Sequence, residues 1–554
     1  MAEGDNELIA RSGAFEPLRE PLFRRIWIAS LFSNFGQLIQ SVGAAWAMTQ
    51  LTGRADMVAL VQTATFAPLM LISLPAGAIA DSYDRRKIAL FALGIAISGA
   101  AGLSLITMFG LLTPGLLLLF CMIVGTGTAL FSPAWQASVG EQVPPNALPQ
   151  AIALNSISYN IARSFGPAIG GILVALAGVL AAFTFNSFAY LPMILVMFLW
   201  RRPPEKSRLP PEALGRAIIS GVRYAFHSPP IRTVWLRTLI VSLIGSSVPA
   251  LMPLISRELL GGEASLYGIL LGCFGGGAVI GALAIGRVRA AVSDQRTMAL
   301  CVGFAGLGMI GVGASRIALL TGLLLIATGA AWMVVVALCT ISMQLSSPRW
   351  VTGRALAAFT TAVTAGMAIG GWGWGYIAAI HGTDVAMLGS GAAMLVSIGA
   401  GLVLRMPEIE EQRDRDMPLV DLDAGLDLTG RSGPIVVTIE YRVATDQARA
   451  FYRAMLDMES IRHRTGGYSW SLSRDIGDPE LWIERYHAPT WHDYLRQRSR
   501  PTAADMKAWD RALAYHRGDG PVRIRRLLER PYGSVRWSDD VPDRGMILPP
   551  PQPS

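Results

Sequence analysis

The hydrophobic positions of this chain fall into long, nearly uninterrupted runs, and short polar segments separate one run from the next. About 20 apolar residues are enough to cross the hydrocarbon core of a bilayer. The pattern therefore predicts an all-α polytopic membrane protein with twelve transmembrane helices. The expected spans cover residues 26–51, 56–80, 88–111, 114–135, 150–177, 179–200, 233–255, 265–286, 297–314, 317–344, 354–379 and 383–404.

Composition agrees with a membrane protein. Of the 554 residues, 52% are hydrophobic and only 16% are charged, whereas about a quarter of the residues of a soluble protein are charged. The four cysteines lie inside apolar runs without metal-ligand spacing, so we interpret them as packing residues and expect no metal site. The formal charge of +8 comes from bases beside the apolar runs. We therefore expect a lipid bilayer and no nucleic acid as partner.

The bases also predict orientation, because cytoplasmic loops near membrane helices are rich in Lys and Arg. Alternate connections hold nearly all of them, and the opposite connections hold only Arg54, Arg257 and Arg316. Both termini are therefore expected in the cytoplasm, and the polar residues 1–25 are expected to form a cytoplasmic segment rather than a cleaved signal peptide. The basic clusters are Arg19, Arg24 and Arg25; Arg85, Arg86 and Lys87; Arg201, Arg202, Lys206, Arg208, Arg216 and Arg223; Arg287, Arg289 and Arg296; Arg349 and Arg354; and Arg405.

The connection 201–232 is long, basic and rich in proline, and it divides the spans into two six-helix halves, 26–200 and 233–405. The halves resemble each other in their fifth spans, where SFGPAIGGI at 164–172 corresponds to AGMAIGGWG at 365–373. A weaker correspondence joins 77–87 to 281–291, after the second span of each half. Repeated six-helix halves around a central cavity are typical of major facilitator transporters.

The stretch GAIADSYDRRKI at 77–88 resembles the loop between helices two and three of the major facilitator superfamily. Gly77, Asp81 and the bases Arg85, Arg86 and Lys87 fit that loop. Ser82 stands where a base is usual, and Asp84 stands where the family has a glycine that permits positive φ. The resemblance implies that Asp81 holds the cytoplasmic ends of the halves together in the outward-facing state. The alternative is that the bases only orient the chain.

A second motif, Gly166-Pro167-Ala-Ile-Gly170-Gly171, resembles the GPxxGG element of facilitator exporters that work by antiport. Spans 26–404 resemble the family that includes the enterobactin exporter and macrolide efflux pumps, also called transmembrane secretion effectors. The resemblance implies export of a small organic molecule across a bacterial inner membrane by alternating access, with proton antiport. A close-packing face of small residues is the simpler alternative for this motif.

Polar residues inside two spans are the candidates for a substrate cavity. Buried polar stripes of membrane helices normally face the protein interior. Contact with substrate and plain interhelical hydrogen bonding remain equal alternatives for the neutral members, whereas Arg163 is the stronger candidate because a charge at membrane depth is costly. The candidates are Asn34, Gln37 and Ser41 in the first span and Asn155, Tyr159 and Arg163 in the fifth.

No Asp or Glu lies well inside an expected span, so the residue that couples transport to protons is not evident. Asp56, which opens the second span, and His381 with Asp384 near the end of the eleventh are the candidates. Facilitated export down a gradient remains open. The chain has no phosphate-binding G-x-x-x-x-G-K-[ST] loop, so ATP drive is not supported.

After residue 405 the composition changes. Residues 406–434 are expected to form a linker, 435–530 a small soluble domain, and 531–554 a disordered tail. The domain's elements are expected in the order β-α-β-β-α-β, with strands near 468–475, 480–487 and 522–528, which is ferredoxin-like. It resembles dimeric α/β barrels of the antibiotic-biosynthesis monooxygenase type, many of which have no cofactor. Its four histidines, His463, His487, His492 and His516, are expected to be solvated rather than catalytic or metal-binding.

We expect this domain to pair with a second copy, because a four-stranded sheet leaves one face to cover. The leading interpretation is thus a transporter without a cofactor, not an enzyme. A membrane-tethered, cofactor-independent monooxygenase and a regulatory membrane protein are the alternatives, and the sequence does not identify the substrate.

Overall fold

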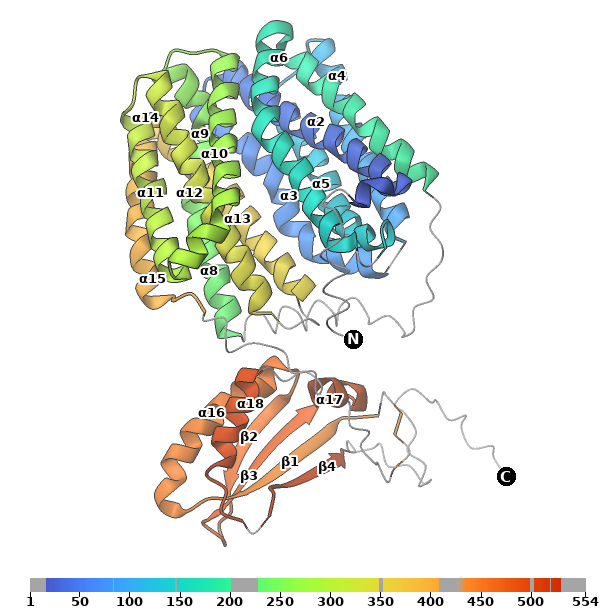
Figure 1. Cartoon of the computed structure of the whole chain (residues 1–554), viewed down its shortest axis with the longest axis vertical. Coiled ribbons are helices and arrows are strands. Elements are labelled where there is room, and N and C mark those ends of the chain that lie inside the picture. The colour runs from blue at the N-terminus through green and yellow to red at the C-terminus, as the bar shows by residue number, and fades with distance from the viewer. Residues whose placement is uncertain are drawn as a thin grey trace, which may run out of the picture. The chain divides into compact units, whose positions relative to one another are not determined.

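The computed structural model describes residues 16–82, 84–144, 147–200, 228–347, 352–407, 426, 428–429, 432–498, 503–518 and 520–529. The chain divides into two compact units. The first comprises Met1–Ile218, Thr233–Met343 and Arg354–Pro407, and the described part of it is helical. The second contains Glu408–Ser554 and a four-stranded sheet (Figure 1).

The first half of the helical unit begins with the short η1 (Glu16–Arg19) and continues through helices that follow the expected spans closely. Pro21 starts α2 at a position where a missing N–H costs nothing. Thr113 starts α5 by accepting a hydrogen bond from the Leu116 amide. The helices are α2 (Pro21–Thr52), α3 (Ala55–Ser82), α4 (Arg85–Met108), α5 (Pro114–Ser138) with η2 (Val139–Glu141), and α6 (Leu148–Leu199).

In the second half, the expected first span is built from three pieces and the last from three more. Pro253 lies at the point where the first of these changes from α to π geometry. The elements are α8 (Pro229–Gly245), α9 (Ser247–Leu254), η4 (Ile255–Leu259), α10 (Ala264–Ala291), α11 (Asp294–Ala314), α12 (Ala318–Leu345), α13 (Thr352–His381), α14 (Thr383–Val396), η5 (Ser397–Gly399) and α15 (Ala400–Val403).

Helix α6 covers two expected spans. Gly178 interrupts it with φ 75° and ψ 173°, a conformation that only glycine adopts readily. At 1.5 Å per residue, the limbs before and after Gly178 are roughly 45 Å and 31 Å long, and each exceeds the roughly 30 Å of a bilayer core. The two limbs are drawn as one kinked helix in Figure 1.

Ten segments of the described residues are long and apolar enough to cross a membrane, and one of them is the 50-residue Gln150–Leu199. The chain is therefore a mostly helical, multi-span membrane protein. Helix α2 is not among the ten, because its polar stripe and the pair Arg24 and Arg25 lower its hydropathy.

The helices alternate in direction, so the unit has two ends. We call the proximal end the one at which α2 starts and α3 finishes, and the distal end the one at which α2 finishes and α3 starts. Gly53, Gly178 and Gly382 lie in distal connections, and all three have positive φ. Such residues permit the tight reversals between helices.

Small residues bring α2 against the second limb of α6. A Cβ at Gly36 would stand 2.6 Å from the Ala189 Cβ, and a Cβ at Gly43 would stand 2.8 Å from the Ala182 Cβ. Without a hydrophobic driving force in lipid, close backbone approach of this kind supplies much of the association between helices.

The second unit contains the strands β1 (Ile435–Arg442), β2 (Tyr468–Arg474), β3 (Leu481–Ala488) and β4 (Arg523–Leu528), in the sheet order β2-β3-β1-β4 with antiparallel neighbours. Helices α16 (Ala448–Arg464), α17 (Trp491–Arg498) and α18 (Ala503–Leu513) complete it, after η7 (Thr445–Gln447). One face of the sheet packs on the helices: Ile439 and Tyr441 of β1 contact a core that includes Phe451, Met455 and Ala512.

The other face of this sheet is mixed in polarity. A polar row runs across all four strands as Ser471, Arg485, Thr438 and Arg525, which the strand registers place side by side. The adjacent row on the same face holds Tyr468, His487, Val436 and Leu527, and Leu527 is 51% exposed. Pairing of two copies over this face stays a prediction.

Candidate functional site

The loop between α3 and α4 differs from expectation at Asp84. Its backbone has φ −61° and ψ 111°, not the positive φ that the family's glycine implied. Asp84 is instead the N-cap of α4, and its carboxylate accepts hydrogen bonds from the amides of Arg86 at 2.9 Å and Lys87 at 3.3 Å. Aspartate suits this position because it satisfies amides that have no partner in the first turn.

Two bases of this loop bind groups of their own half. Arg85 pairs with Glu141 of η2 at 2.7 Å. Arg86 donates to the carbonyl oxygens of Met197 at 2.9 Å and Phe198 at 2.5 Å, in the last turn of α6, where carbonyls lack helical partners. These contacts tie the proximal ends of α4, η2 and α6 together. The side chain of Asp81 lies outside the described residues, and Gly77 lies within α3 with open space around its Cα.

The glycines of 166–171 lie at two different interfaces. Gly166 and Gly170 face α2 of the same half, where added Cβ atoms would stand 3.1 Å from the Leu38 Cβ and 3.1 Å from the Ile39 Cα. Gly171 faces the other half: its Cβ would stand 2.6 Å from the Gly268 Cα and 2.6 Å from the Ala264 carbonyl oxygen of α10.

The contact between α6 and α10 continues along both helices. A Cβ at Gly268 would stand 2.6 Å from the Pro167 carbonyl oxygen, and one at Gly275 would stand 2.6 Å from the Arg163 carbonyl oxygen. We call this contact the α6–α10 seam. Backbone meets backbone here, which explains why glycine occupies these positions.

The corresponding stretch in the second half has the same arrangement, offset by 200 positions. Gly366 and Gly370 face α8 of their own half, with Leu243 as their common neighbour. Gly371 faces α3 of the other half, but a Cβ there would stand 3.7 Å from the Thr63 Oγ1 and 3.8 Å from the Gln62 Nε2, and equally 3.8 Å from the Ala250 Cβ of its own half. The repeat seen in the sequence is thus a repeat of contacts, and the second copy is looser at this position.

We call the contact between α3 and α13 the α3–α13 seam. Thr63 donates to the Ala368 carbonyl oxygen at 2.7 Å, and the hydroxyls of Ser73 and Thr361 are 2.9 Å apart. A Cβ at Gly375 would stand 2.2 Å from that of Ala59. The α6–α10 seam occupies the distal and middle parts of its helices, whereas the α3–α13 seam extends past the middle to Ser73 and Thr361.

Exposure along α6 changes from one end to the other. At the proximal end, Ile152, Ser156 and Tyr159 are exposed, the last to 47%. Spacings of four and three continue this face to Gly166, Pro167 and Gly170, all of which are buried. We call residues 152–163 on this face the inner strip. It is exposed near the proximal end, and further along the same face Gly166 and Gly170 are covered by α2 of the same half.

The fifth-span candidates lie on or beside the inner strip. Tyr159 is exposed, and Arg163 is half-buried directly before the seam. Asn155 is half-buried, and its Oδ1 is buried without a hydrogen-bond partner among the described residues. Of these three side chains, Tyr159 is the most exposed in this state, and the Asn155 Oδ1 is buried.

The first-span candidates make hydrogen bonds within the protein. Gln37 donates to the Thr128 hydroxyl of α5 at 2.7 Å, and the Asn34 amide reaches the Ser158 hydroxyl of α6 at 3.4 Å. Ser41 is exposed and donates to the Leu38 carbonyl oxygen in its own helix. Gln37 and Asn34 thus join helices in this state.

The coupling candidates lie at the distal end, away from the inner strip. Asp56 binds Arg54 at 2.7 Å, and Asp384 binds Arg316 at 3.3 Å. His381 is exposed at the last residue of α13. The structure does not bring these three together with the candidates on α2 and α6.

Sequence reasoning missed a buried polar cluster in the first half. Gln40 of α2 accepts a hydrogen bond from Asn186 of α6, and both side chains are almost completely buried. Gln40 follows Gln37 by three positions, so the stripe on α2 was a signal for it. Asn186 gave no such signal, because it is a single polar residue in an apolar run.

In the second unit, a buried ion pair lies between sheet and helices. Glu484 is fully buried and accepts hydrogen bonds from Arg462 at 2.9 Å, Tyr441 at 3.0 Å and Trp470 at 3.1 Å. Burial raises the pKa of Tyr486, over which Arg462 lies, to about 12. Every oxygen of Glu484 is thus occupied, which indicates a structural role.

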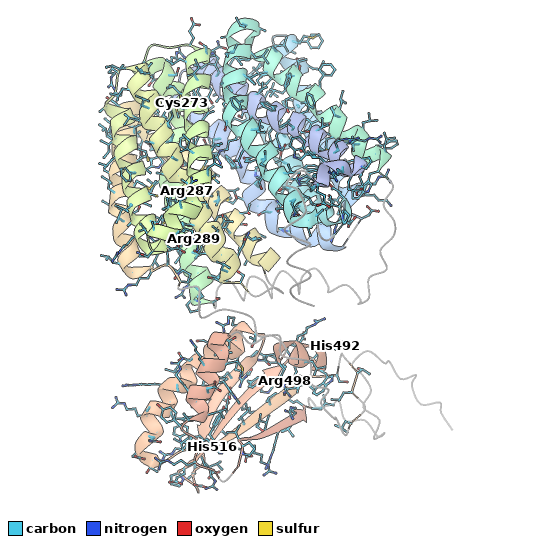
Figure 2. The ribbon with its side chains drawn as sticks, in the orientation of Figure 1. Cys273, Arg287, Arg289, His492, Arg498 and His516 are labelled. Atoms are coloured by element: carbon cyan, nitrogen blue, oxygen red, sulfur yellow. The ribbon has the colours of Figure 1, made fainter. Side chains whose placement is uncertain are left out.

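The histidines of the second unit do not converge. His492 on α17 and His516 after α18 lie at opposite ends of the domain (Figure 2). His487 lies on β3 with a side chain only 13% exposed, 3.6 Å from the Glu529 carboxylate, so it is less solvated than we expected.

Comparison with known proteins also indicates a membrane transporter. A family model described as transmembrane secretion effector, of the major facilitator type, matches residues 12–532. The staphyloferrin A transporter of Staphylococcus aureus is 23% identical over 52% of this chain and 73% of its own. A multidrug efflux pump of Mycobacterium tuberculosis is 25% identical over 51% and 69%, and the enterobactin exporter of Escherichia coli 26% identical over 72% and 94%.

Among solved structures, a bacterial homologue of the human lysosomal transporter Spinster, in an inward-facing and occupied conformation, matches with a TM-score of 0.57. It is 14% identical and covers 71% of this chain and 98% of its own. At this identity the match concerns the fold.

Proposed function

Because the chain belongs to the transmembrane secretion effector family of major facilitator transporters, we propose that it exports a small siderophore-like or drug-like molecule by alternating access. The relatives named above transport a siderophore, export a siderophore or pump out drugs, which supports this class of substrate. The family and its relatives are transporters, so the alternative of a membrane-tethered enzyme is not favoured.

One observation carries the proposal: the two halves touch at the distal end through Arg257 and Thr49 and along the α6–α10 seam, while Tyr159 of α6 is exposed nearer the proximal end. A transporter that works by alternating access needs a state that is sealed at one end and open at the other. The arrangement supports assigning this state to the loading step of export.

We assign the proximal end to the cytoplasm. Arg85, Arg86 and Lys87 lie there, and so do Arg287 and Arg289 on α10 (Figure 2). The positive-inside rule then supports two cytoplasmic termini, with the helical unit in a bacterial inner membrane. Twelve spans follow if α2 and each limb of α6 cross once, and this is supported by the length of the limbs.

For the binding site we propose Asn155, Tyr159 and Arg163 as primary contacts, with Asn34, Gln37 and Ser41 of the adjacent α2 as further candidates. Arg163 offers charged donors to a carboxylate or a carbonyl-rich group, and the Asn155 Oδ1 offers an acceptor that has no hydrogen-bond partner among the described residues. The gating roles of Asp81 and of the GPxxGG glycines, Gly166, Pro167, Gly170 and Gly171, belong to the same proposal.

We further propose proton antiport. Asp56 and Asp384 each bind an arginine at the distal end, and release of that arginine would allow a proton to bind. Proton-driven uptake of substrate into inside-out vesicles tests this, with Asp56→Asn and Asp384→Asn as the variants. Export without a proton gradient would favour the facilitated alternative.

For the end of the chain we propose a linker at 406–434, a ferredoxin-like cytoplasmic domain at 435–530 and a tail at 531–554. We propose a regulatory or pairing role for this domain. The strand order β2-β3-β1-β4 agrees with such a fold. A chain stopped after Arg405 should still export if the domain is regulatory, and size-exclusion chromatography of isolated 432–529 measures pairing.

The decisive experiment is a thermal-stability screen of the purified full chain against siderophores, macrolides and cationic dyes. A true substrate raises the unfolding temperature of the wild type, because ligand binding stabilises the folded state. Arg163→Gln should lose most of this shift, whereas Arg316→Gln, far from the inner strip, should retain it. Cells that carry the wild-type chain should then export the same compound.

A further inference from the structure

The three bases that depart from the positive-inside pattern are all explained by contacts at the distal end. Arg54 pairs with Asp56 within the first half, and Arg316 pairs with Asp384 within the second. Arg257 differs from both, because its Nη1 donates to the Thr49 carbonyl oxygen of the other half at 2.6 Å.

The acceptor of this bond is a helix end. Thr49 is among the last four residues of α2, whose carbonyls have no partner in the ladder of their own helix. The C-terminus of a helix also carries partial negative charge, which attracts a guanidinium. Arg257 therefore satisfies an otherwise incomplete helix end across the boundary between the halves.

The donor is held by its own half. The neighbouring residue Glu258 accepts a hydrogen bond from the Thr383 hydroxyl of α14 at 2.6 Å, and Thr383 is buried. One turn deeper on α2, Trp46 stacks on Tyr267 of α10, with ring centroids 6.3 Å apart. The segment η4 thus presents Arg257 from the second half, at the mouth of the sealed end.

We infer that Arg257 and the Thr49 carbonyl form a distal latch, which stabilises the state closed at the distal end and must open before substrate leaves there. Arg257 is thus a positioning residue for the transport cycle, and this role rests on the proposed function. The distal-open state separates the halves at this end and lacks the bond. The latch therefore sets part of the balance between the two states.

The test measures the distance between the halves without substrate. Leu111→Cys and Ile317→Cys lie in distal connections of opposite halves, and both native side chains are 63% exposed. Spin labels at these positions, in a full chain whose four cysteines are replaced, report the distal distance by double electron–electron resonance. Arg257→Gln should raise the population at long distance about five- to tenfold, and Arg257→Lys should restore part of the closed population.

Ser104→Ala is the matched control, because it breaks a hydrogen bond to Thr184 within one half near the distal end and should leave the distances unchanged. An Arg257→Gln distribution equal to that of the wild type, or an equal change in Ser104→Ala, would overturn the latch. If no compound is transported but the distances shift as stated, the proposed function fails and the latch stands.

Discussion

The α6–α10 seam allows a sharp prediction, because the repeat supplies its own control. Gly171 and Gly371 occupy corresponding positions in the two halves, and each faces a helix of the opposite half. Substituting alanine at each position adds the same methyl group to the same kind of helix. The two sites differ in the space that receives it.

At Gly171 the new Cβ would stand 2.6 Å from both the Gly268 Cα and the Ala264 carbonyl oxygen. Ordinary contact needs about 3.4 Å, so the two backbones must separate by about 0.8 Å, the difference between the two values. Neither neighbour is a side chain that could turn away. Overpacking of this kind costs about 1–3 kcal/mol.

This overpacking destabilises only the distal-closed state. Alanine also favours the helix over glycine by about 1 kcal/mol, but that gain is present in both conformations and cancels from their equilibrium. Gly171→Ala should therefore shift the population toward the distal-open state by about 5- to 150-fold. Gly371→Ala, whose nearest neighbours are 3.7 Å away, should leave the equilibrium unchanged.

The spin-label pair at 111 and 317 measures this directly, and initial rates of substrate export measure its consequence. Gly275→Ala is a second variant, because its Cβ would stand 2.6 Å from the Arg163 carbonyl oxygen. The reasoning is refuted if Gly171→Ala keeps the wild-type distances, or if Gly371→Ala shifts them equally.

Three further predictions concern other parts of the chain. Asp84→Ala should destabilise the start of α4 by about 1 kcal/mol, seen as faster amide exchange at 85–88, whereas Asp84→Gly should cost a few tenths, because glycine is a tolerated N-cap; equal exchange in both variants would contradict the cap. Glu484→Leu should destabilise the second unit by about 3–5 kcal/mol in urea titrations of the full chain followed by tryptophan fluorescence, since Arg462 would be left buried without its partner; wild-type stability would show that the pair is dispensable. Because the folded-state pKa of Tyr486 is about 12, above its ordinary value, the stability of this unit should fall as the pH rises above about 10, where only the unfolded phenol ionises; a flat profile between pH 9 and 11 would refute this.

Much of the helical unit could be predicted from the sequence. Membrane spans must satisfy their backbone hydrogen bonds internally, and they are therefore recognisable as long apolar runs. The glycine pairs at 170–171 and 370–371 were visible as a repeat, and their contacts confirm it. The elements of the second unit were also predicted in the right order, since strands and helices there alternate in hydrophobic period.

Pairings between distant residues were not predictable in the same way. Glu141, the partner of Arg85, lies in a segment without bases that carried no topological information. Asp84 was read through the family's glycine, although its own capping ability is the better guide. The polar row on the sheet was missed because the register that aligns Arg485 with Thr438 and Arg525 depends on strand pairing, which a single strand does not reveal.

At the boundary between the halves, two of the three hydrogen bonds described above have a side chain as donor and a main-chain carbonyl as acceptor: Thr63 to Ala368, and Arg257 to Thr49. A carbonyl is present whatever residue occupies the position. Substitutions should therefore be tolerated at positions 49 and 368 by any residue that fits the helix. Positions 63 and 257 should accept only the few residues whose side chains can donate the hydrogen bond. In such a transporter, many side chains between the halves can be substituted while the hydrogen bonds that control separation of the halves are kept.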